Sequence, residues 1–364
     1  MYLNHLSILQ YRNITECDVQ FSPKINCFLG KNGMGKTNLL DAIYYLSFCK
    51  SHLNPVDSQI IKHDTDFFML HGSYIRKGVE ESVSCGVKRR AKKQFKRNKK
   101  EYERLSEHIG FLPIVLVSPS DLELITDGSD ERRRFLDTVI SQYDKPYLAA
   151  LITYNVALQN RNAMMKREST LDETMLDIYE EQMSREAQYI YKLRSEFIIG
   201  FTPVFQHFYQ LISGGKEQVS LSYVSHSQIG NISSLLKDCR ERDHLLGYTT
   251  RGSHKDDLIM LLGDYPIKRT GSQGQNKTYL VALKLAQYLF LKQISEVSPI
   301  LLLDDIFDKL DADRVTRIMQ LVASSDFGQI FITDTNREHL DNLLLRIGEK
   351  AKMFEVQDGH ILMI

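Results

Sequence analysis

Short stretches near the N-terminus alternate apolar and polar residues, a pattern that predicts β-strands. Residues 2–10 and 17–29 both follow it, and the second stretch turns fully apolar just before a glycine-rich turn. Over about residues 36–47 the apolar side chains instead recur at helical spacing. Further alternating segments lie between about 66 and 118 and end in the apolar run 113–117. A strand, a glycine-rich turn and a helix therefore follow one another early in the chain.

The middle of the chain shows a different pattern. From about residue 131 to 212 apolar residues recur at helical spacing and glycines are few, which predicts a mainly helical lobe. Strand patterns return at 219–224 and 258–262, and a helix is expected over about 275–294. The helical lobe is therefore expected as an insertion between two α/β segments.

The C-terminal part of the chain predicts a parallel sheet. The apolar run 299–303 is typical of a central parallel strand, and it is followed by a helix near 312–324 and another buried strand at 329–333. We therefore expect an α/β head built from two parts of the chain. The expected divisions are residues 1–105 and 213–364 for the head and 106–212 for the lobe.

The composition is that of a globular protein and names no partner by itself. The 364 residues are 43% apolar and 25% charged with only eight prolines, and the length exceeds that of one ordinary core. Forty-six basic residues balance forty-six acidic ones, so any polyanion site must come from local clustering. The five cysteines show no disulfide-like or zinc-like spacing, and no apolar run is long enough to span a bilayer. We expect a cytoplasmic protein with reduced cysteines and no membrane partner.

Residues 30–37 have the sequence Gly-Lys-Asn-Gly-Met-Gly-Lys-Thr and satisfy the pattern G-x-x-x-x-G-K-[ST] of a P-loop. The glycines of such a loop let successive backbone N–H groups point at phosphate oxygens. The ammonium of Lys36 is expected to reach the β- and γ-phosphates, and the hydroxyl of Thr37 to bind Mg²⁺. A plain glycine turn before a helix is the alternative, but the flanking strand and helix favour ATP binding. The expected ATP contacts are Gly30, Lys31, Asn32, Gly33, Met34, Gly35, Lys36, Thr37 and Asn38.

The second half of such a site is a carboxylate at the end of a buried strand. The apolar run 299–303 is followed by Asp304 and Asp305. We expect Asp304 to bind Mg²⁺ together with Thr37, and Asp305 to polarise the attacking water, which makes Asp305 and Lys36 the catalytic residues. The alternative is that the two acids merely begin a surface loop. In that case the Mg²⁺ of the P-loop would lack its carboxylate ligand.

About 270 residues separate these two motifs, far more than in a small GTPase or a nucleotide kinase, which favours an ABC-type ATPase. The sequence Ser272-Gln273-Gly274-Gln275, at the start of an expected helix, is similar to the ABC signature loop. In that class the serine hydroxyl and the free N–H groups of the helix hold the γ-phosphate of ATP bound by the other subunit. We therefore expect Ser272, Gly274 and Gln275 to bind nucleotide across a homodimer interface. An ordinary helix N-cap is the alternative.

Several motifs in one order make the chain resemble the RecF family of DNA recombination and repair ATPases over nearly its full length. They are Tyr11-Arg12-Asn13, the P-loop with Asn38, residues 119–137, residues 248–257, Asp304-Asp305 and Leu310-Asp311. The resemblance implies an SMC-like head that dimerises on ATP, binds DNA at gaps and helps to load recombinase with RecR and RecO. It also implies slow hydrolysis, since Asp305 stands where transporter-type enzymes usually carry glutamate, and it adds Arg12 to the nucleotide contacts.

The sequence departs from the family pattern at a few positions. Ser253 and Lys255 stand where the family usually has proline and arginine. After the expected strand at 329–333, where ABC enzymes often carry a switch histidine, residues 333–335 are Thr-Asp-Thr. His339 is expected on a helix face, so the sequence does not support sensing of the γ-phosphate by a histidine.

Residues 88–100 hold nine lysines and arginines among thirteen positions and no acidic residue. On strands or a hairpin such a segment can neutralise several phosphates without reading base sequence, although a charged run is often only a solvated face. With the resemblance added, we expect DNA contacts here. The expected contacts are Lys92, Lys93, Lys96, Arg97, Lys99 and Lys100. Arg132, Arg133 and Arg134 are a second candidate, unless they only pair with nearby acids at a helix start.

Two other classes of protein share parts of these patterns. A transporter-type ATPase subunit has the same nucleotide motifs but not the RecF-like residues 132–137 and 248–257. A P-loop ATPase linked to a nuclease needs an added metal-binding domain, for which no residues remain. Asp311 and Asp313 are therefore expected in the dimer-interface loop after the Mg²⁺ aspartate rather than in a nuclease site. His254 either contacts nucleotide or an interface, or is a hydrogen-bonded loop histidine.

Overall fold

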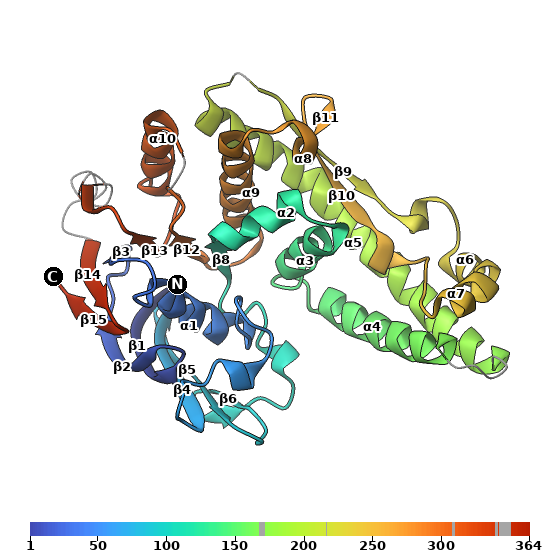
Figure 1. Cartoon of the computed structure of the whole chain (residues 1–364), viewed down its shortest axis with the longest axis horizontal. Helices are drawn as coiled ribbons and strands as arrows, with labels where there is room; N and C mark the ends of the chain where they lie inside the picture. Colours follow the sequence, from blue (N-terminus) through green and yellow to red (C-terminus); the bar gives the residue numbers. More distant parts are fainter. Residues whose placement is uncertain (167–171, 216, 308–309, 339–340, 342–350) are drawn as a thin grey trace. The chain divides into compact units, whose positions relative to one another are not determined.

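The computed structural model describes residues 1–166, 172–215, 217–307, 310–338, 341 and 351–364. The chain forms two compact units, whose elements are labelled in Figure 1. The first unit consists of Met1–Asp121, Leu211–Gly214 and Gln273–Ile364, and the second of Leu122–Gln210 and Gly215–Ser272. The segment Gly215–Ser272, which the sequence pattern assigned to the head, thus groups with the helical residues.

In the first unit, six strands form an antiparallel sheet in the order β2-β1-β4-β5-β6-β7. The strands are β1 (Tyr2–Tyr11), β2 (Ile14–Gln20), β4 (Phe67–Arg76), β5 (Val79–Lys88), β6 (Gln94–Arg97) and β7 (Lys100–Glu101). The prediction of one strand over 17–29 is wrong, because β2 ends at Gln20 and β3 begins at Ile25. Pro23 lies between them and has no N–H to donate to a neighbouring strand. There Ser22 N donates instead to the side-chain oxygen of Asn26 (2.7 Å).

The second sheet of this unit has the order β15-β14-β3-β13-β12-β8, with parallel pairing from β14 to β8 and β15 antiparallel at the edge. Its strands are β3 (Ile25–Leu29), β8 (Ile114–Val117), β12 (Ile300–Asp304), β13 (Ile330–Asp334), β14 (Ala351–Gln357) and β15 (His360–Met363). β8, β12 and β13 are buried along their length, which confirms the expected strands at 113–117, 299–303 and 329–333. Parallel pairing brings the carboxyl ends of β3, β13 and β12 to one edge of the sheet.

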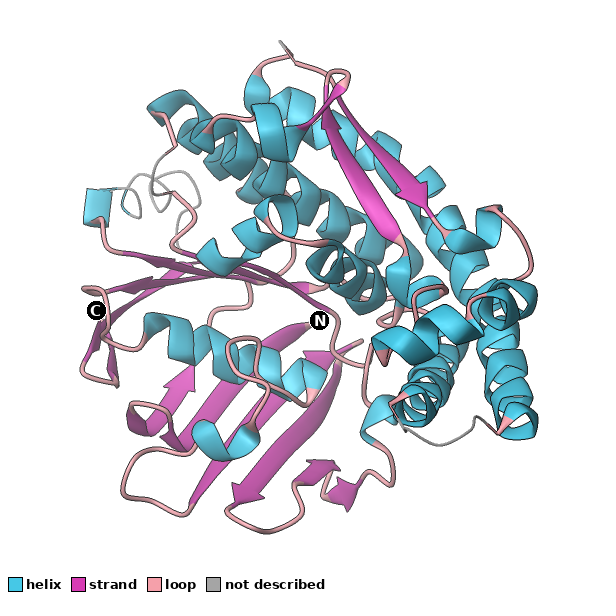
Figure 2. Ribbon diagram, turned by 45° about the vertical axis from the view of Figure 1, so that its right-hand side comes forward, coloured by secondary structure: helices cyan, strands magenta, loops and turns pink. Residues whose placement is uncertain are grey.

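Helix α1 (Lys36–Phe48) fills the space between these two sheets. Its apolar side chains join one buried cluster with residues from strands of both sheets, and Figure 2 shows the helix layer between them. Helix α9 (Gln273–Ile294) lies near β8, and α10 (Ala312–Val322) follows β12. The helices expected at 36–47, 275–294 and 312–324 are therefore confirmed.

The second unit is mainly helical and carries one small antiparallel sheet. Its elements are α2 (Glu123–Thr126), α3 (Ser129–Ile140), α4 (Lys145–Met165), most of α5 (Glu173–Ser213), α6 (Ile232–Asp238), α7 (Arg240–Leu246), α8 (Ile267–Thr270), β9 (Val219–Val224), β10 (Asp257–Leu262) and β11 (Tyr265–Pro266). The helical pattern over 131–212 and the strands at 219–224 and 258–262 are confirmed. Because β9 pairs with β10 and α3 packs near β10, these strands belong with the helices.

Short 3₁₀ turns connect several of these elements. They lie at Asp57–Gln59, Leu105–Glu107, Pro119–Leu122, His226–Gln228 and Ser253–Lys255. Within the described ranges, no helix combines the length and the hydropathy needed to cross a bilayer.

Candidate functional site

The P-loop joins the end of β3 to the start of α1. Gly33 and Gly35 adopt left-handed backbone angles, with φ of 82° and 112°, which side-chain-bearing residues rarely adopt. Lys36 is 3% exposed, and its Nζ donates hydrogen bonds to the carbonyl oxygens of Gly30 (2.7 Å) and Lys31 (3.2 Å). The ammonium group thus lies within the curl of its own loop.

Asp304, at the end of β12, lies beside the first turn of α1. Thr37 Oγ1 donates to Asp304 Oδ2 (2.8 Å), and Thr333 Oγ1, from the end of β13, donates to Asp304 Oδ1 (2.6 Å). Burial raises the pKa of the Asp304 carboxyl, while the hydrogen bonds from Thr333 and Thr37 and the charge of Lys36 oppose that rise. A threonine hydroxyl and a carboxylate in contact are the protein ligands that P-loop sites offer to Mg²⁺, so the donor set fits this metal.

Asp305 follows with a left-handed φ of 45°, which turns the chain out of the strand. Its backbone N–H donates to Thr333 Oγ1 (3.0 Å), and its Oδ2 lies 4.0 Å from Lys36 Nζ. The Asp305 side chain is 28% exposed, so water can reach it. Thr333 therefore holds both aspartates from the neighbouring strand. In the sequence, Thr333 stands out only as the residue where a switch histidine is absent, although a polar residue at the end of a buried parallel strand is a signal for this role.

The signature-like loop lies at the start of α9. Ser272 is exposed and directly precedes the helix, while Gly274 and Gln275 lie half-buried in its first turn. A Cβ on Gly274 would lie 3.0 Å from Nη1 of Arg314, the end of a flexible side chain. Because Ser272 is exposed, a second molecule can reach it.

Asp311 caps helix α10, because its Oδ1 accepts a hydrogen bond from Arg314 N (2.9 Å). Among the residues with described positions, no three His, Cys, Asp or Glu side chains gather so as to hold a metal ion. Asp311 and Asp313 thus form no nuclease-like cluster with the described residues. His339, which was expected on a helix face, lies outside the described residues.

The N-terminal motif supports the P-loop and α1. Arg12 Nε donates to Asp41 Oδ2 on α1 (3.1 Å), so its guanidinium holds the helix, and its contact with nucleotide stays a prediction. Asn13 reaches the loop directly: its Oδ1 accepts from Asn38 Nδ2 (2.7 Å), and its amide occupies the space beside Gly35. The sequence alone does not indicate this role of Asn13, since only the folded sheet brings it to the loop.

The cations of the basic segment 88–100 differ in their partners. Lys93 Nζ lies 2.7 Å from Asp57 Oδ2, and Arg97 donates two hydrogen bonds to Glu81 (2.9 and 2.6 Å). These two cations are therefore tied to acidic partners within the first unit. The other expected DNA contacts are Lys92, Lys99 and Lys100, which are exposed, and the half-exposed Lys96.

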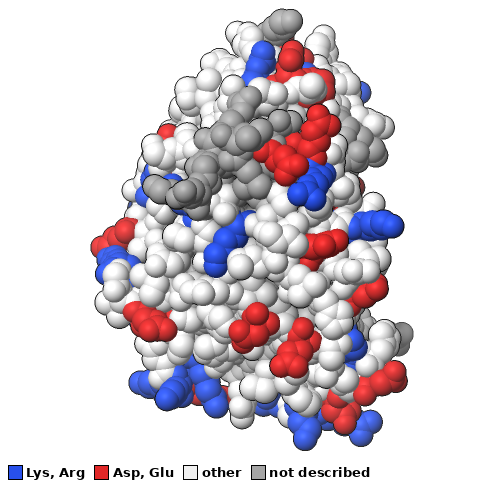
Figure 3. Space-filling model, turned by 90° about the vertical axis from the view of Figure 1, so that its left-hand side faces the viewer, with Lys and Arg blue, Asp and Glu red and all other residues white. Residues whose placement is uncertain are grey.

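The three arginines of α3 also have acidic partners, and two of these partners lie in the first turn of the same helix, as the helix-start interpretation expects. The pairs are Arg132 with Asp257, Arg133 with Asp130 and Arg134 with Glu131. On the face shown in Figure 3, basic and acidic side chains are interspersed and do not form a field of one sign. Neither observation adds a DNA-binding surface to the basic segment.

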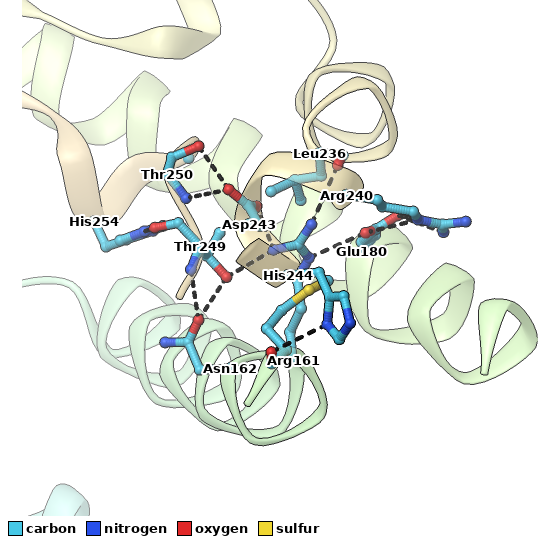
Figure 4. A network of polar contacts seen from close by, with 12 residues as sticks. Arg161, Asn162, Glu180, Leu236, Arg240, Asp243, His244, Thr249, Thr250 and His254 are labelled. Atoms are coloured by element: carbon cyan, nitrogen blue, oxygen red, sulfur yellow. Dashed lines mark hydrogen bonds and ion pairs between the residues drawn. The ribbon is translucent and has the colours of Figure 1, made fainter. Parts of the chain in front are cut away.

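The segment 248–257 is anchored by a buried polar network in the second unit (Figure 4). Arg161 is fully buried and donates to the Thr249 hydroxyl (2.8 Å) and to Asp243 Oδ2 (2.7 Å). Asp243 Oδ1 in turn accepts from the hydroxyl of Thr250 (2.7 Å). This RecF-like motif therefore fixes a loop against α4 and α7.

His254 belongs to the same loop and is enclosed by it. Its Nδ1 lies 2.8 Å from the Tyr154 hydroxyl, and its Nε2 lies 3.0 Å from the carbonyl oxygen of Thr249. Burial lowers the pKa of His254 to about 4. Of the two interpretations, the hydrogen-bonded loop histidine is the one that these contacts support.

Known proteins match the chain over nearly its whole length. A family model described as RecF/RecN/SMC N terminal domain matches residues 2–361. The chain is 60% identical over 363 residues to the DNA replication and repair protein RecF of Phocaeicola vulgatus, covering 99% of this chain and 98% of that protein. It is 49% identical over 365 residues to the protein of the same name from Porphyromonas gingivalis, covering 99% and 100%. These full-length matches set aside the transporter-type and nuclease-linked alternatives.

Solved structures give the same result for the fold. The recombination mediator protein RecF with ATP, of the RecFOR pathway, matches with a TM-score of 0.89 and 28% identity, covering 100% of this chain and 97% of that one. The Smc head domain of Pyrococcus furiosus, solved with an extended coiled coil, matches with a TM-score of 0.59 and 16% identity, which concerns the fold alone. The expected SMC-like α/β ATPase head is therefore confirmed.

Proposed function

Because the chain belongs to the RecF family, we propose that it binds ATP with Mg²⁺, dimerises on ATP and acts on DNA in recombinational repair and replication. The arrangement of Thr37, Asp304 and Thr333 carries this proposal. These residues come from three separate elements, and their side chains meet at the carboxyl edge of the parallel sheet beside the P-loop. A surface loop with two incidental acids would not hold one of them 3% exposed between two hydroxyls.

In this proposal the phosphates of ATP replace hydrogen bonds that Lys36 makes within its own loop. The Lys36 ammonium exchanges the carbonyl oxygens of Gly30 and Lys31 for β- and γ-phosphate oxygens, which are stronger acceptors for a cation. Thr37 and Asp304 would hold Mg²⁺, which neutralises phosphate charge when bound. Loss of the Lys36 charge should therefore remove triphosphate binding without unfolding the protein.

Asp305 is the proposed general base. Its carboxylate is partly exposed and fixed at its backbone N–H by Thr333, so it can take a proton from a water molecule that attacks the γ-phosphate. An aspartate reaches less far than the glutamate of transporter-type enzymes. Slow hydrolysis follows, and ATP then acts as a switch rather than as a fuel.

A homodimer completes the site in this proposal. Ser272, exposed at the start of α9, contacts the γ-phosphate bound by a facing copy, with Gly274 and Gln275 in the adjacent helix turn. The dimer forms only when ATP fills the P-loop, since the phosphate is the group that both copies share.

DNA contact is proposed for the exposed part of the basic segment, Lys92, Lys96, Lys99 and Lys100. Lys93 and Arg97 are left out because their charges are already paired. Contacts of this kind bind phosphates without base preference and weaken with salt. By family membership, the partners at gapped DNA are the RecR and RecO proteins, in the cytoplasm where the chromosome lies.

Sedimentation velocity with and without ATP, and with gapped DNA, tests nucleotide, dimer and DNA together. We expect a monomer without nucleotide and a dimer with ATP, and we expect Lys36→Met to remain monomeric at every ATP concentration. Lys77→Met is the matched control, because Lys77 lies in an exposed turn and pairs with Glu296. An ATP-dependent dimer of Lys36→Met equal to that of wild type would contradict the proposal.

A further inference from the structure

The β14–β15 hairpin contacts the P-loop through its turn, Asp358-Gly359. Gly359 N donates a hydrogen bond to the carbonyl oxygen of Met34 (2.8 Å), and Asp358 N lies 3.5 Å from Met34 Sδ. The hairpin reaches this place because β14 pairs in parallel with β3, the strand that leads into the loop. None of the sequence motifs of an ABC-type site lies in this hairpin.

The approach is too close for side chains at three glycines. A Cβ on Gly30 would collide with the carbonyl oxygen of Val356 on β14. A Cβ on Gly359 would lie 2.5 Å from the carbonyl oxygen of Asn13, and one on Gly35 would lie 2.9 Å from the Asn13 side-chain amide. Backbone therefore packs on backbone where Gly30 meets Val356 and where Gly359 meets Asn13, and the Asn13 side chain fills the space beside Gly35.

The hydrogen bond from Gly359 has a direct geometric effect on phosphate binding. The Met34 carbonyl and the Gly35 N–H belong to one planar trans peptide, so they point in opposite directions. Holding the carbonyl toward the hairpin aims the Gly35 N–H away from it. Since Gly35 has a left-handed φ and no side chain to restrict it, this peptide would otherwise turn easily.

We propose that the β14–β15 turn is a further element of the nucleotide site, in which Gly359 positions the Met34–Gly35 peptide for a phosphate of ATP. Gly359 is a positioning residue, since it acts through the loop and does not itself touch the ligand. The inference rests on the proposed ATP site at residues 30–37. It adds the C-terminal hairpin to the parts of the chain that set ATP affinity.

Gly359→Ala is the test, with Gly78→Ala as a matched control. Both glycines lie in hairpin turns with a φ of +81°, so alanine introduces the same backbone strain at each. At Gly78 no atom lies within 4 Å of the added Cβ, whereas at Gly359 the Asn13 carbonyl does. Any difference between the two variants therefore reports the close approach and not the strain.

ATP affinity is measured by titration calorimetry, and the thermal midpoint is recorded with and without ATP. Without nucleotide we expect Gly359→Ala to lose at least as much stability as Gly78→Ala, because its added Cβ also meets the Asn13 carbonyl oxygen. Gly359→Ala should also bind ATP about tenfold or more weakly, because a misdirected N–H loses its hydrogen bond to a charged phosphate. The stabilisation by ATP should shrink in that variant alone.

Equal ATP affinity in the two alanine variants would overturn the inference and leave the ATP site itself intact. Failure of the wild-type protein to bind ATP would instead overturn the proposed function. If Gly359→Ala does not fold, Gly359→Asn and Gly78→Asn replace the pair, since asparagine tolerates left-handed φ. Failure of both variants at 359 to fold, with both at 78 folded, would make the turn a folding element and refute its positioning role.

Discussion

Thr333→Val removes one hydroxyl that holds both aspartates of the candidate site. Valine has nearly the same shape, so the change deletes the hydrogen bond to Asp304 Oδ1 (2.6 Å) and the one from Asp305 N (3.0 Å) without leaving a cavity. The Asp305 N–H keeps the Thr333 main-chain carbonyl oxygen at 3.3 Å, so the main loss is at Asp304.

The magnitude follows from the charged acceptor. A hydrogen bond to a carboxylate contributes about 1.5–3 kcal/mol, which corresponds to a roughly ten- to hundredfold loss of affinity for MgATP. The pKa of Asp304 should rise further, because the bond from Thr333 is one of the contacts that lower it. Protonation then competes with Mg²⁺ at a higher pH, so MgATP binding should fall off earlier as the pH is lowered.

The assay compares ATP binding with Mg²⁺ and with a chelator, in wild type, Thr333→Val and Thr333→Ser. Serine retains the hydroxyl and should restore most of the affinity. ATP alone should bind the valine variant as it binds wild type, since the P-loop is untouched. If MgATP binds Thr333→Val with unchanged affinity, Thr333 does not hold the metal-binding carboxylate and the site has been assigned incorrectly.

Three further changes test other parts of the structure. Arg161→Met should lower the free energy of unfolding by about 3–5 kcal/mol, since it leaves the buried Asp243 without its cationic partner, whereas the exposed Arg185→Met should change it by less than about 1 kcal/mol in the same denaturant titration. Lys99→Met should weaken DNA binding and lower the slope of log affinity against log salt by about one. Lys93→Met should mainly destabilise the fold, because Lys93 pairs with Asp57. A DNA titration over a salt series measures the first effect, and a melting curve measures the second. The pKa of His254 is lower in the folded protein than the ordinary value of 6.5, so the stabilisation present above pH 6.5 should be lost as the pH falls toward about 4, and His254→Gln should flatten that decline in melting temperature.

The nucleotide motifs were predictable because their chemistry is local in sequence. The P-loop needs glycines, a lysine and a threonine within eight positions, and the apolar strand before Asp304 is visible without any structure. Their meeting was also inferable, since the carboxyl ends of parallel strands share an edge. The sequence therefore predicted that the loop and the two aspartates lie together, while their roles in metal binding and catalysis stay predictions.

The rest depended on contacts between distant residues. The pairing of Arg97 with Glu81 follows from the register of β6 on β5, and that of Lys93 with Asp57 from the packing of the turn Asp57–Gln59 near β5, neither of which composition reveals. The role of Thr333 needed β13 beside β12, and the packing of Gly359 on Asn13 needed β14 beside β3. Periodicity within a segment cannot show which segments become neighbours.

The pairing of β14 with β3 has a consequence for synthesis of the chain. Residues 351–357 must be made before the strand that leads into the P-loop gains this neighbour, so the loop is framed only after most of the polypeptide has left the ribosome. A chain that ends before residue 351 therefore lacks both this neighbouring strand and the Gly359 N–H that holds the Met34 carbonyl.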